Sequence, residues 1–352
     1  MDSILLTVNI HGWIQENWAL IGAIITIGVV LFACQFFVRH YAGIVLNIFS
    51  DTPPPLLVNL LDFRRVEGDI VRFRSFDGIS LQGMWLNPPK GMKVKGTILF
   101  CHEYGADMYT ASRYTTSLIE SGYRVFTFDF RAHGKSSGAS YHPLQWPSDK
   151  ELCDVLGALA HVRQTQEAEG SSAELGIFGI SRGAGVALLA ASTDPDIKAV
   201  LCDGAFCTQT TIITYMKRWA HHFAKIRLVY ENHPEIFWKF LYRVMIRKAQ
   251  VKLNRRFPSV SKAAKSLSQR PVFFIHGEKD SYIRVEQSKE LHEITPDPKY
   301  LWIVPKARHN QSVMVDPAQY SARTVGFFDK HLANETISDE IIRTGLAVEN
   351  IA

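Results

Sequence analysis

The chain has 352 residues, of which 47% are apolar and 21% charged, and its formal net charge is +5. This length allows one large α/β domain with a sizeable core, and no internal repeat or low-complexity tract is visible, which excludes repeat and low-complexity architectures. The five cysteines (34, 101, 153, 202 and 207) are odd in number and mostly lie in core-like segments, which indicates reduced thiols rather than a disulfide framework.

The first predicted element is a transmembrane helix. Residues 18–38 contain no charged side chain, and a helix of this length extends about 31 Å, close to the ~30 Å hydrocarbon core of a bilayer. Trp18 and Tyr41 lie at its two ends, where amphipathic aromatic side chains favour the membrane interface. We therefore expect residues 1–41 to form an N-terminal segment with a single-pass anchor.

Three other interpretations of this segment remain open. A cleaved signal peptide is disfavoured because residues 1–17 contain no Lys or Arg and the apolar stretch is too long. The run LFAC at 31–34 partly resembles a lipidation motif and would make the protein a lipoprotein. The apolar sequence that continues after the cysteine argues against this interpretation. The third alternative is a buried helix of the globular domain.

The charges beside the span predict its orientation. Asp2 and Glu16 precede it without any Lys or Arg, whereas Arg39 and His40 follow it. The positive-inside rule then places the rest of the chain in the cytoplasm. Residues 42–68 read as a linker, because the three prolines at 53–55 block helix continuation.

Residues 69–334 are predicted to form one α/β domain, followed by a C-terminal tail at 335–352. Its strands are expected at 70–76, 79–87, 96–102, 123–128, 174–180, 198–202, 271–276 and 299–304. Its helices are expected at 111–121, 148–166, 182–192, 285–293 and 318–332. An early hairpin followed by alternating strands and helices indicates a mostly parallel sheet with helices on both faces.

The pentapeptide GISRG at 179–183 lies directly between an apolar strand and a helix. This strand–turn–helix setting is typical of a nucleophile elbow, in which a sharp turn exposes a serine, here Ser181. The flanking Gly179 and Gly183 leave room where a Cβ would clash.

Two further reactive groups follow in the loops after later strands. Asp280 ends the run HGEKD after the strand near residue 275, and His309 lies in ARHN after the strand ending near 304. The carboxyl ends of strands meet at the ligand-binding edge of an open α/β sheet. A serine needs a base, and the base needs a carboxylate that orients it, so the order Ser, Asp, His predicts a catalytic triad.

Together these segments resemble the α/β-hydrolase superfamily in its esterase-like branch, which includes dienelactone-hydrolase-like and feruloyl-esterase-like enzymes and acyl-peptidase domains. The resemblance covers about residues 72–332. The segments that carry it are the hairpin at 72–85, TILFCH at 97–102, FDFRAHGKS at 128–136, GISRG, HGEKD and ARHN. It implies Ser181 as nucleophile, His309 as base and Asp280 as orienting acid.

Some assignments have competitors. Asp203 also follows a strand, and some hydrolases take the acid from that position. His102 and His133 lie in glycine-containing loops and are expected to be structural rather than catalytic.

The oxyanion loop departs from the family pattern. The family has His-Gly-x after the third strand, whereas this chain has Glu103 in place of the glycine. By position, the donors would be the backbone amides of Tyr104 and Arg182. A glutamate is strained if that position needs φ > 0. We expect its carboxylate to point away from the site or to pair with a cation.

Residues 205–269 form an insertion whose helical periodicity at 210–229 and 234–253 predicts a cap over the active-site mouth. Between residues 217 and 270 there are 14 Lys or Arg and 2 Glu, so this segment carries 14 − 2 = +12. An amphipathic helix pair with solvated lysines explains the pattern. Alternatively, the basic face contacts anionic lipid or attracts a lipid-like substrate.

The sequence therefore predicts a membrane-anchored serine hydrolase that cleaves carboxylic esters, thioesters or related acyl bonds through an acyl-enzyme. No cofactor is implied, no metal-ligand spacing is present, and no nucleic-acid motif accompanies the basic segment. The alternatives are an acyl-peptidase or amidase with the same triad, and a non-catalytic binding scaffold.

Overall fold

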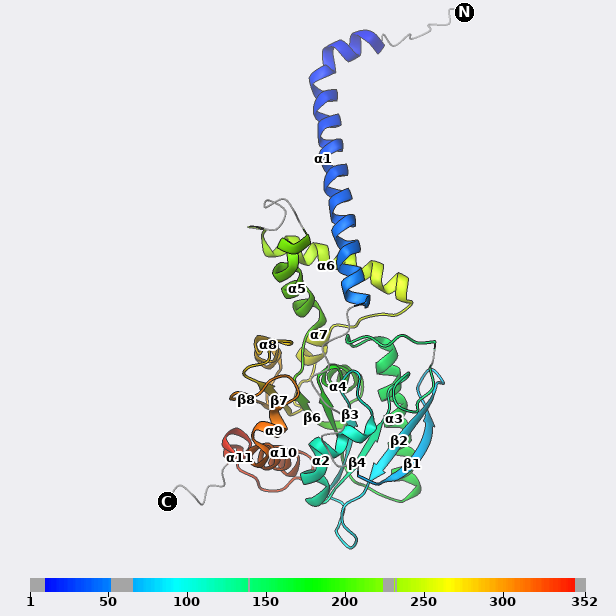
Figure 1. The fold of residues 1–352 in the computed structure, drawn as a ribbon, viewed down its shortest axis with the longest axis vertical. Coiled ribbons are helices and arrows are strands. Elements are labelled where there is room, and N and C mark those ends of the chain that lie inside the picture. The colour runs from blue at the N-terminus through cyan, green and yellow to red at the C-terminus, as the bar shows by residue number, and fades with distance from the viewer. Residues whose placement is uncertain (1–9, 52–65, 139, 224–230, 232, 346–352) are drawn as a thin grey trace, which may run out of the picture.

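The computed structural model describes residues 10–51, 66–138, 140–223, 231 and 233–345. A single α/β domain carries a long helix, α1 (Ile10–Asp51), which projects away from it (Figure 1). The domain contains the expected sheet with helices on both faces, so the predicted fold class is confirmed.

Eight strands form one sheet in the order β1-β2-β4-β3-β5-β6-β7-β8. Their bounds are β1 Asp69–Arg74, β2 Ser80–Leu86, β3 Gly96–Cys101, β4 Tyr123–Phe128, β5 Leu175–Ile180, β6 Ile197–Asp203, β7 Val272–Gly277 and β8 Lys299–Val304. The β1–β2 and β2–β4 pairs are antiparallel, and β4 onward is parallel. The register sets Cys101 opposite Gly179 and Ile180 opposite Asp203, so the carboxyl ends of β3, β5 and β6 lie together.

The central strands are continuous apolar runs because both of their faces are covered. Every residue of β3, β5 and β7 is buried. The edge strand β8 instead alternates between buried and half-buried residues. All eight strands lie within one or two residues of their predicted positions.

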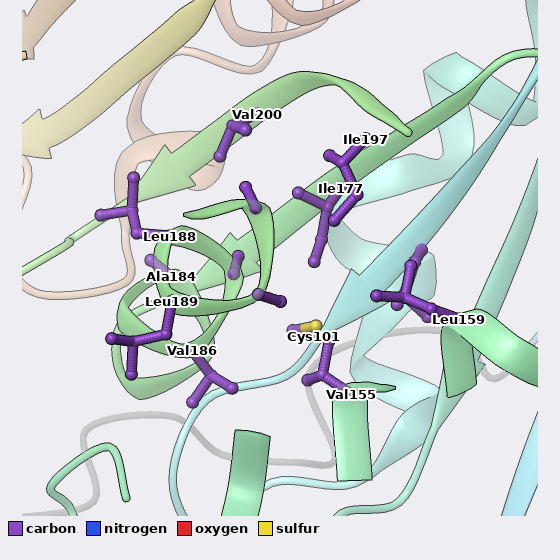
Figure 2. Packing of buried hydrophobic residues seen from close by; sticks show 14 of the residues in the cluster. Cys101, Val155, Leu159, Ile177, Ala184, Val186, Leu188, Leu189, Ile197 and Val200 are labelled. Atoms are coloured by element: carbon purple, nitrogen blue, oxygen red, sulfur yellow. The ribbon is translucent and has the colours of Figure 1, made fainter. Parts of the chain in front are cut away.

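Helices α3 (Asp149–Ala168), α4 (Arg182–Thr193), α7 (Val260–Lys265) and α8 (Glu286–Ile294) contribute to the apolar core on one face of the sheet. Helices α2 (Ala111–Glu120), α10 (Pro317–His331) and α11 (Asp339–Thr344) contribute to the core on the other face. Figure 2 shows side chains of α4, such as Ala184 and Leu188, gathered with Val200 of β6 and Val155 of α3. This packing fixes α4, and therefore the turn before it, against the sheet.

The insertion is helical, as expected. Helix α5 (Thr208–Phe223) and helix α6 (Glu235–Leu253) are described, whereas residues 224–229 of the expected first helix lie outside the described residues. Both helices bury apolar side chains in a third core that also includes Trp146, Phe206 and Ile283 from loops of the α/β domain. The third core therefore joins the cap to the domain.

The expected linker differs from the structure in its first ten residues. Helix α1 continues through residues 42–51 instead of ending near Tyr41, and it buries Ala42, Leu46 and Phe49 in the third core. These positions have helical spacing, and no proline interrupts the helix before residue 53. The three prolines themselves lie outside the described residues.

The expected tail also contains structure. Helix α11 places the fully buried Ile342 in the core beneath α10. Three short elements that the periodicity did not predict are a 3-10 turn at Met108–Thr110, α7 and α9 (Ser312–Val315). Each is three to six residues long, which is too short to give a helical period.

Candidate active site

Ser181 lies in the sharp turn between β5 and α4. Its backbone has φ 52° and ψ −114°, a conformation that is strained for any residue with a Cβ. The backbone N–H of Ser181 donates to the carbonyl of Asp203 at the end of β6 (2.7 Å). The fold thus holds a serine in an unfavourable geometry that turns its hydroxyl out of the strand.

The two flanking glycines are needed because chains pass very close to them. A Cβ on Gly179 would lie 2.4 Å from the carbonyl oxygen of Gly183, and a Cβ on Gly183 would lie 2.1 Å from that of Cys101. Both distances are shorter than real contacts, and the obstructing atoms belong to backbone. The turn therefore has no room for a side chain at position 179 or 183.

The structure brings Ser181, His309 and Asp280 together in one hydrogen-bonded chain. The Oγ of Ser181 lies 2.9 Å from Nε2 of His309, and Nδ1 of His309 lies 2.6 Å from Oδ2 of Asp280. An ionised Asp280 can only accept, so it fixes the proton on Nδ1 and leaves Nε2 free to accept from the serine. This is the geometry that lets an imidazole act as a general base.

Asp280 is held as an anion by several donors. Its Oδ1 accepts from the backbone amides of Tyr282 and Ile283 (2.9 and 2.8 Å), and Nε2 of His276 lies 3.3 Å from Oδ2. Burial alone would raise the pKa of Asp280, but hydrogen bonds from His276 and His309 lower it well below its usual value. The carboxyl is thus charged at neutral pH and can stabilise an imidazolium.

The competing acid, Asp203, points elsewhere. Its carboxylate accepts from the hydroxyls of Ser312 (3.2 Å) and Tyr320 (3.1 Å). No hydrogen bond joins its side chain to His309 within the described residues. Burial raises the pKa of Asp203 to about 6, so this carboxyl is partly neutral under mildly acidic conditions.

A pH-dependent stability follows for Asp203. Because its folded pKa of about 6 lies above its reference value of 3.8, the native state binds the proton more tightly, and this stabilisation is lost as pH rises through that interval. The free energy of unfolding of Asp203→Asn relative to the parent should therefore increase by on the order of 2–3 kcal/mol from about pH 4 to about pH 7. Denaturant titrations at both pH values measure this difference. A constant difference would contradict the burial argument.

The oxyanion loop accommodates Glu103 without backbone strain. Glu103 is not among the described residues with positive φ, whereas Gly105 two residues later has φ 75°. Its carboxyl is buried and accepts long hydrogen bonds, 3.4 Å each, from the hydroxyls of Thr110 and Tyr114. Burial raises the pKa of this carboxyl, which favours its neutral form.

The expectation for Glu103 is thus met only in part. The hydroxyls of the following helical segment bind its carboxyl, and no salt bridge pairs it with a cation among the described residues. Tyr104 and Arg182, the two predicted amide donors, follow the adjacent strands β3 and β5. Their role in holding an oxyanion remains a prediction.

His102 and His133 occupy structural positions. Nε2 of His102 accepts from the backbone amide of Phe130 (3.2 Å), and its Nδ1 lies 2.7 Å from the carbonyl of Glu103. Nδ1 of His133 lies 2.9 Å from the carbonyl of Arg131. Burial lowers the pKa of His133 to about 4 and lowers that of His102 well below its usual value, so both rings are neutral at pH 7 and hold neighbouring loops together.

No cluster of three or more His, Cys, Asp or Glu side chains suited to a metal ion occurs in the part of the chain that the structure describes.

Comparisons with known proteins agree with the fold described above. A family model described as serine aminopeptidase, S33, matches residues 92–234, a segment that includes Ser181 but ends before Asp280 and His309. An esterase from Pyrococcus furiosus has a TM-score of 0.56 at 25% identity, covering 80% of this chain and 100% of the esterase. The chain therefore has the α/β-hydrolase fold and is similar to serine hydrolases of that superfamily.

Other relatives of this hydrolase extend the comparison. The uncharacterized protein YfhR of Escherichia coli O157:H7 is 26% identical over 68% of this chain and 72% of its own length. The uncharacterized protein YqkD of Bacillus subtilis is 24% identical, over 88% and 95%. An acylaminoacyl peptidase of Pyrococcus horikoshii shares the fold, with a TM-score of 0.56 at 19% identity over 82% of this chain and 44% of the peptidase. The family model and the esterase structures, rather than these relatives, support a serine hydrolase similar to carboxylic ester hydrolases.

Sequence reasoning missed one residue of the site. His276 opens the HGEKD run, and its ring contacts both the Asp280 carboxylate and the Ile283 carbonyl (2.9 Å from Nε2). Its position at the end of a strand, four residues before the acid, was a usable signal. The loop that presents Asp280 is therefore held by an internal histidine.

Proposed function

We propose that this protein is a membrane-anchored serine hydrolase that cleaves carboxylic esters or related acyl bonds. The observation that carries the proposal is the Ser181–His309–Asp280 chain, with links of 2.9 and 2.6 Å. Ser181 attacks the acyl carbon as His309 accepts its proton, and His309 then protonates the leaving group. Water, deprotonated by His309, releases the acyl group from Ser181.

Two backbone amides support the proposed oxyanion hole. The amides of Tyr104 and Arg182 follow the neighbouring strands β3 and β5. A negative charge that develops on the acyl oxygen between them would lie beside the N-terminus of α4, which favours it. Burial raises the pKa of the Glu103 carboxyl, and this shift toward the neutral form would reduce its repulsion of that charge.

Esters and amides are distinguished by a matched pair of substrates. The family-model description and the peptidase neighbour make amide cleavage the second candidate. We expect p-nitrophenyl butyrate to be hydrolysed faster than the p-nitroanilide of the same acid, and His309→Ala to lose about 10³-fold or more of the ester rate. Preferential anilide cleavage by the parent would favour the amidase, and equal rates in parent and variant would contradict both.

Helix α1 is proposed to be the membrane anchor. Within its segment Trp13–Ser50, a stretch of 18 residues has a mean hydropathy of 2.4 and contains no buried residue. By the charges at Arg39 and His40, the hydrolase domain would lie in the cytoplasm. The proposed organisation keeps residues 18–38 as the span and extends the hydrolase domain from 69–334 to include α11, with residues 42–51 added to the third core.

The outer side of α6 supports contact with anionic lipid. Helix α6 lies across α1 where the apolar span ends (Figure 1), and Nζ of Lys248 donates to the carbonyl of Arg39 (3.0 Å). One stripe of α6, opposite its buried face, mixes exposed apolar and basic side chains. The stripe consists of Ile236, Lys239, Phe240, Arg243, Arg247, Val251 and Lys252. A span that crosses the bilayer would hold this stripe at headgroup level.

Lysine acylation tests the lipid contact in the full chain. Lys239 and Lys252 should react several-fold more slowly in vesicles of phosphatidylcholine with phosphatidylserine than in detergent, because anionic headgroups cover them. Lys90 and Lys93, exposed in the loop between β2 and β3 on the distal side of the domain (Figure 1), serve as matched controls. Equal slowing of all four lysines, or of none, measured by mass spectrometry, would contradict the contact.

A further inference from the structure

The side chain of Arg182 is fully buried beside the proposed nucleophile. Its Nη1 donates to the carbonyl of Leu144 (3.1 Å), and its guanidinium lies 5.3 Å from the ring of Tyr104. Arg182 and Tyr104 also supply the two proposed oxyanion donors through their backbone amides. The buried guanidinium of Arg182 therefore joins the turn after β5 to the loop of Tyr104, and the oxyanion hole requires these two segments to be aligned.

This buried charge is compensated by Glu151 from the first turn of α3. Nη1 of Arg182 lies 3.7 Å from Oε1 of Glu151, which is itself almost fully buried. Burial alone would raise the pKa of Glu151, but the Arg182 charge and two hydroxyl donors lower it overall. A buried arginine without such a partner would be strongly destabilising.

The contacts continue from Glu151 to the cap. The hydroxyl of Tyr141 donates to Oε1 of Glu151 (2.7 Å) and accepts from Nη1 of Arg255 (2.8 Å). The guanidinium of Arg255 also lies 4.2 Å from the ring of Tyr141, and its Nη2 donates to the carbonyl of His142 (3.0 Å). Arg255 follows the last residue of α6 by two positions. Unlike the exposed basic residues of α6, it is buried and faces the domain.

We propose that Glu151, Tyr141 and Arg255 are positioning residues that align the oxyanion donors and couple their alignment to the seating of the cap. The four side chains, which we name the buried ionic chain (Arg182, Glu151, Tyr141 and Arg255), come from segments that are distant in sequence. Helix α6 packs against α1. The buried ionic chain therefore connects the side of the molecule that carries the anchor with the turn at Ser181. The inference rests on the proposed function.

Oxyanion donors act mainly in the transition state, so their misalignment lowers kcat more than it raises KM. A displacement of catalytic groups by about 1 Å can cost roughly a hundredfold in rate. Removing a side chain that is two contacts away from the oxyanion donors should lower the rate by less than this hundredfold. We therefore expect a tenfold or larger fall in kcat with KM changed by less than about threefold.

Tyr141→Phe and Arg255→Gln test the chain in the full-length protein with a short p-nitrophenyl ester. Tyr141→Phe removes only the bridging hydroxyl, and Arg255→Lys should restore part of kcat because it returns the charge without the planar fork. Arg256→Gln is the matched control, because the Arg256 side chain is exposed and its structural bonds to Asp149 use the backbone. It should leave kcat unchanged.

Two readouts keep the result decisive. Active sites are counted with a fluorophosphonate, so that kcat refers only to folded, reactive molecules. Amide hydrogen exchange across residues 101–106 should quicken in Tyr141→Phe and Arg255→Gln but not in Arg256→Gln. Parental kcat and exchange in the first two variants would overturn the inference while leaving the proposed function intact. If the parent does not hydrolyse any ester, the proposed function fails, and the exchange data alone then decide whether the ionic chain holds the loop.

Discussion

Asp280→Asn is expected to lower kcat/KM for a short-chain ester by roughly 10³–10⁴-fold. Its carboxylate binds Nδ1 of His309 at 2.6 Å, and an asparagine there can present its N–H₂ group, which favours the wrong imidazole tautomer. Burial alone would raise the pKa of Asp280, but hydrogen bonds from His276 and His309 lower it by more. The native carboxyl therefore carries its charge at neutral pH.

Asp203→Asn is the matched control for that substitution. Asp203 is also a buried aspartate, and it is the last residue of the parallel strand β6, but its carboxylate binds Ser312 and Tyr320. Its replacement should change kcat/KM by less than about tenfold, since no transition-state charge depends on it. If the two variants exchanged these effects in steady-state assays, Asp203 would be the orienting acid and the assignment of Asp280 would be wrong.

Phe49→Ala should lower the stability of the full chain by about 3–5 kcal/mol. Phe49 is 1% exposed, stacks on Trp146 at a ring distance of 5.3 Å, and meets Phe257 edge-to-face at 5.0 Å. Its carbonyl also accepts from Nε1 of Trp146 (3.1 Å). The end of α1 thus forms part of the third core, and truncating this side chain leaves a cavity between anchor, cap and domain.

Phe36→Ala on the same helix is the control. Phe36 is 59% exposed within the apolar span, so its loss removes no packing from the folded domain. In detergent, Phe49→Ala should lower Tm by roughly 5–10 °C, whereas Phe36→Ala should leave Tm nearly unchanged. Equal shifts in the two variants would mean that residues 42–51 act as a simple tether rather than as part of the core.

Local pattern predicted most of the fold. The central strands are continuous apolar runs because both faces of the parallel sheet are covered, and each of them leaves a clear signal in the sequence. The strand order along the chain also predicted that Ser181, Asp280 and His309 would meet at one edge, and the structure brings them within hydrogen-bonding distance. Their catalytic roles remain predictions.

What the sequence could not predict depends on contacts between distant segments. The helical continuation through residues 42–51 is stabilised by Trp146, 97 residues away from Phe49. The contact between Tyr141 and Arg255 spans 114 residues, and nothing in either local sequence marks the partner. The sequence also contained no sign of what binds the Glu103 carboxyl. The hydroxyls that donate to it belong to the turn and helix that follow, and only the folded chain brings them close to it.

The central claim is that Ser181 is a nucleophile activated by His309. The most direct test is fluorophosphonate labelling of the purified full-length protein alongside Ser181→Ala, because the probe reacts with a serine whose base and oxyanion site both work. The account predicts that the parent protein is labelled and the variant is not, with both equally folded by circular dichroism. A folded parent that remains unlabelled, or a variant that is labelled to the same extent, would contradict it.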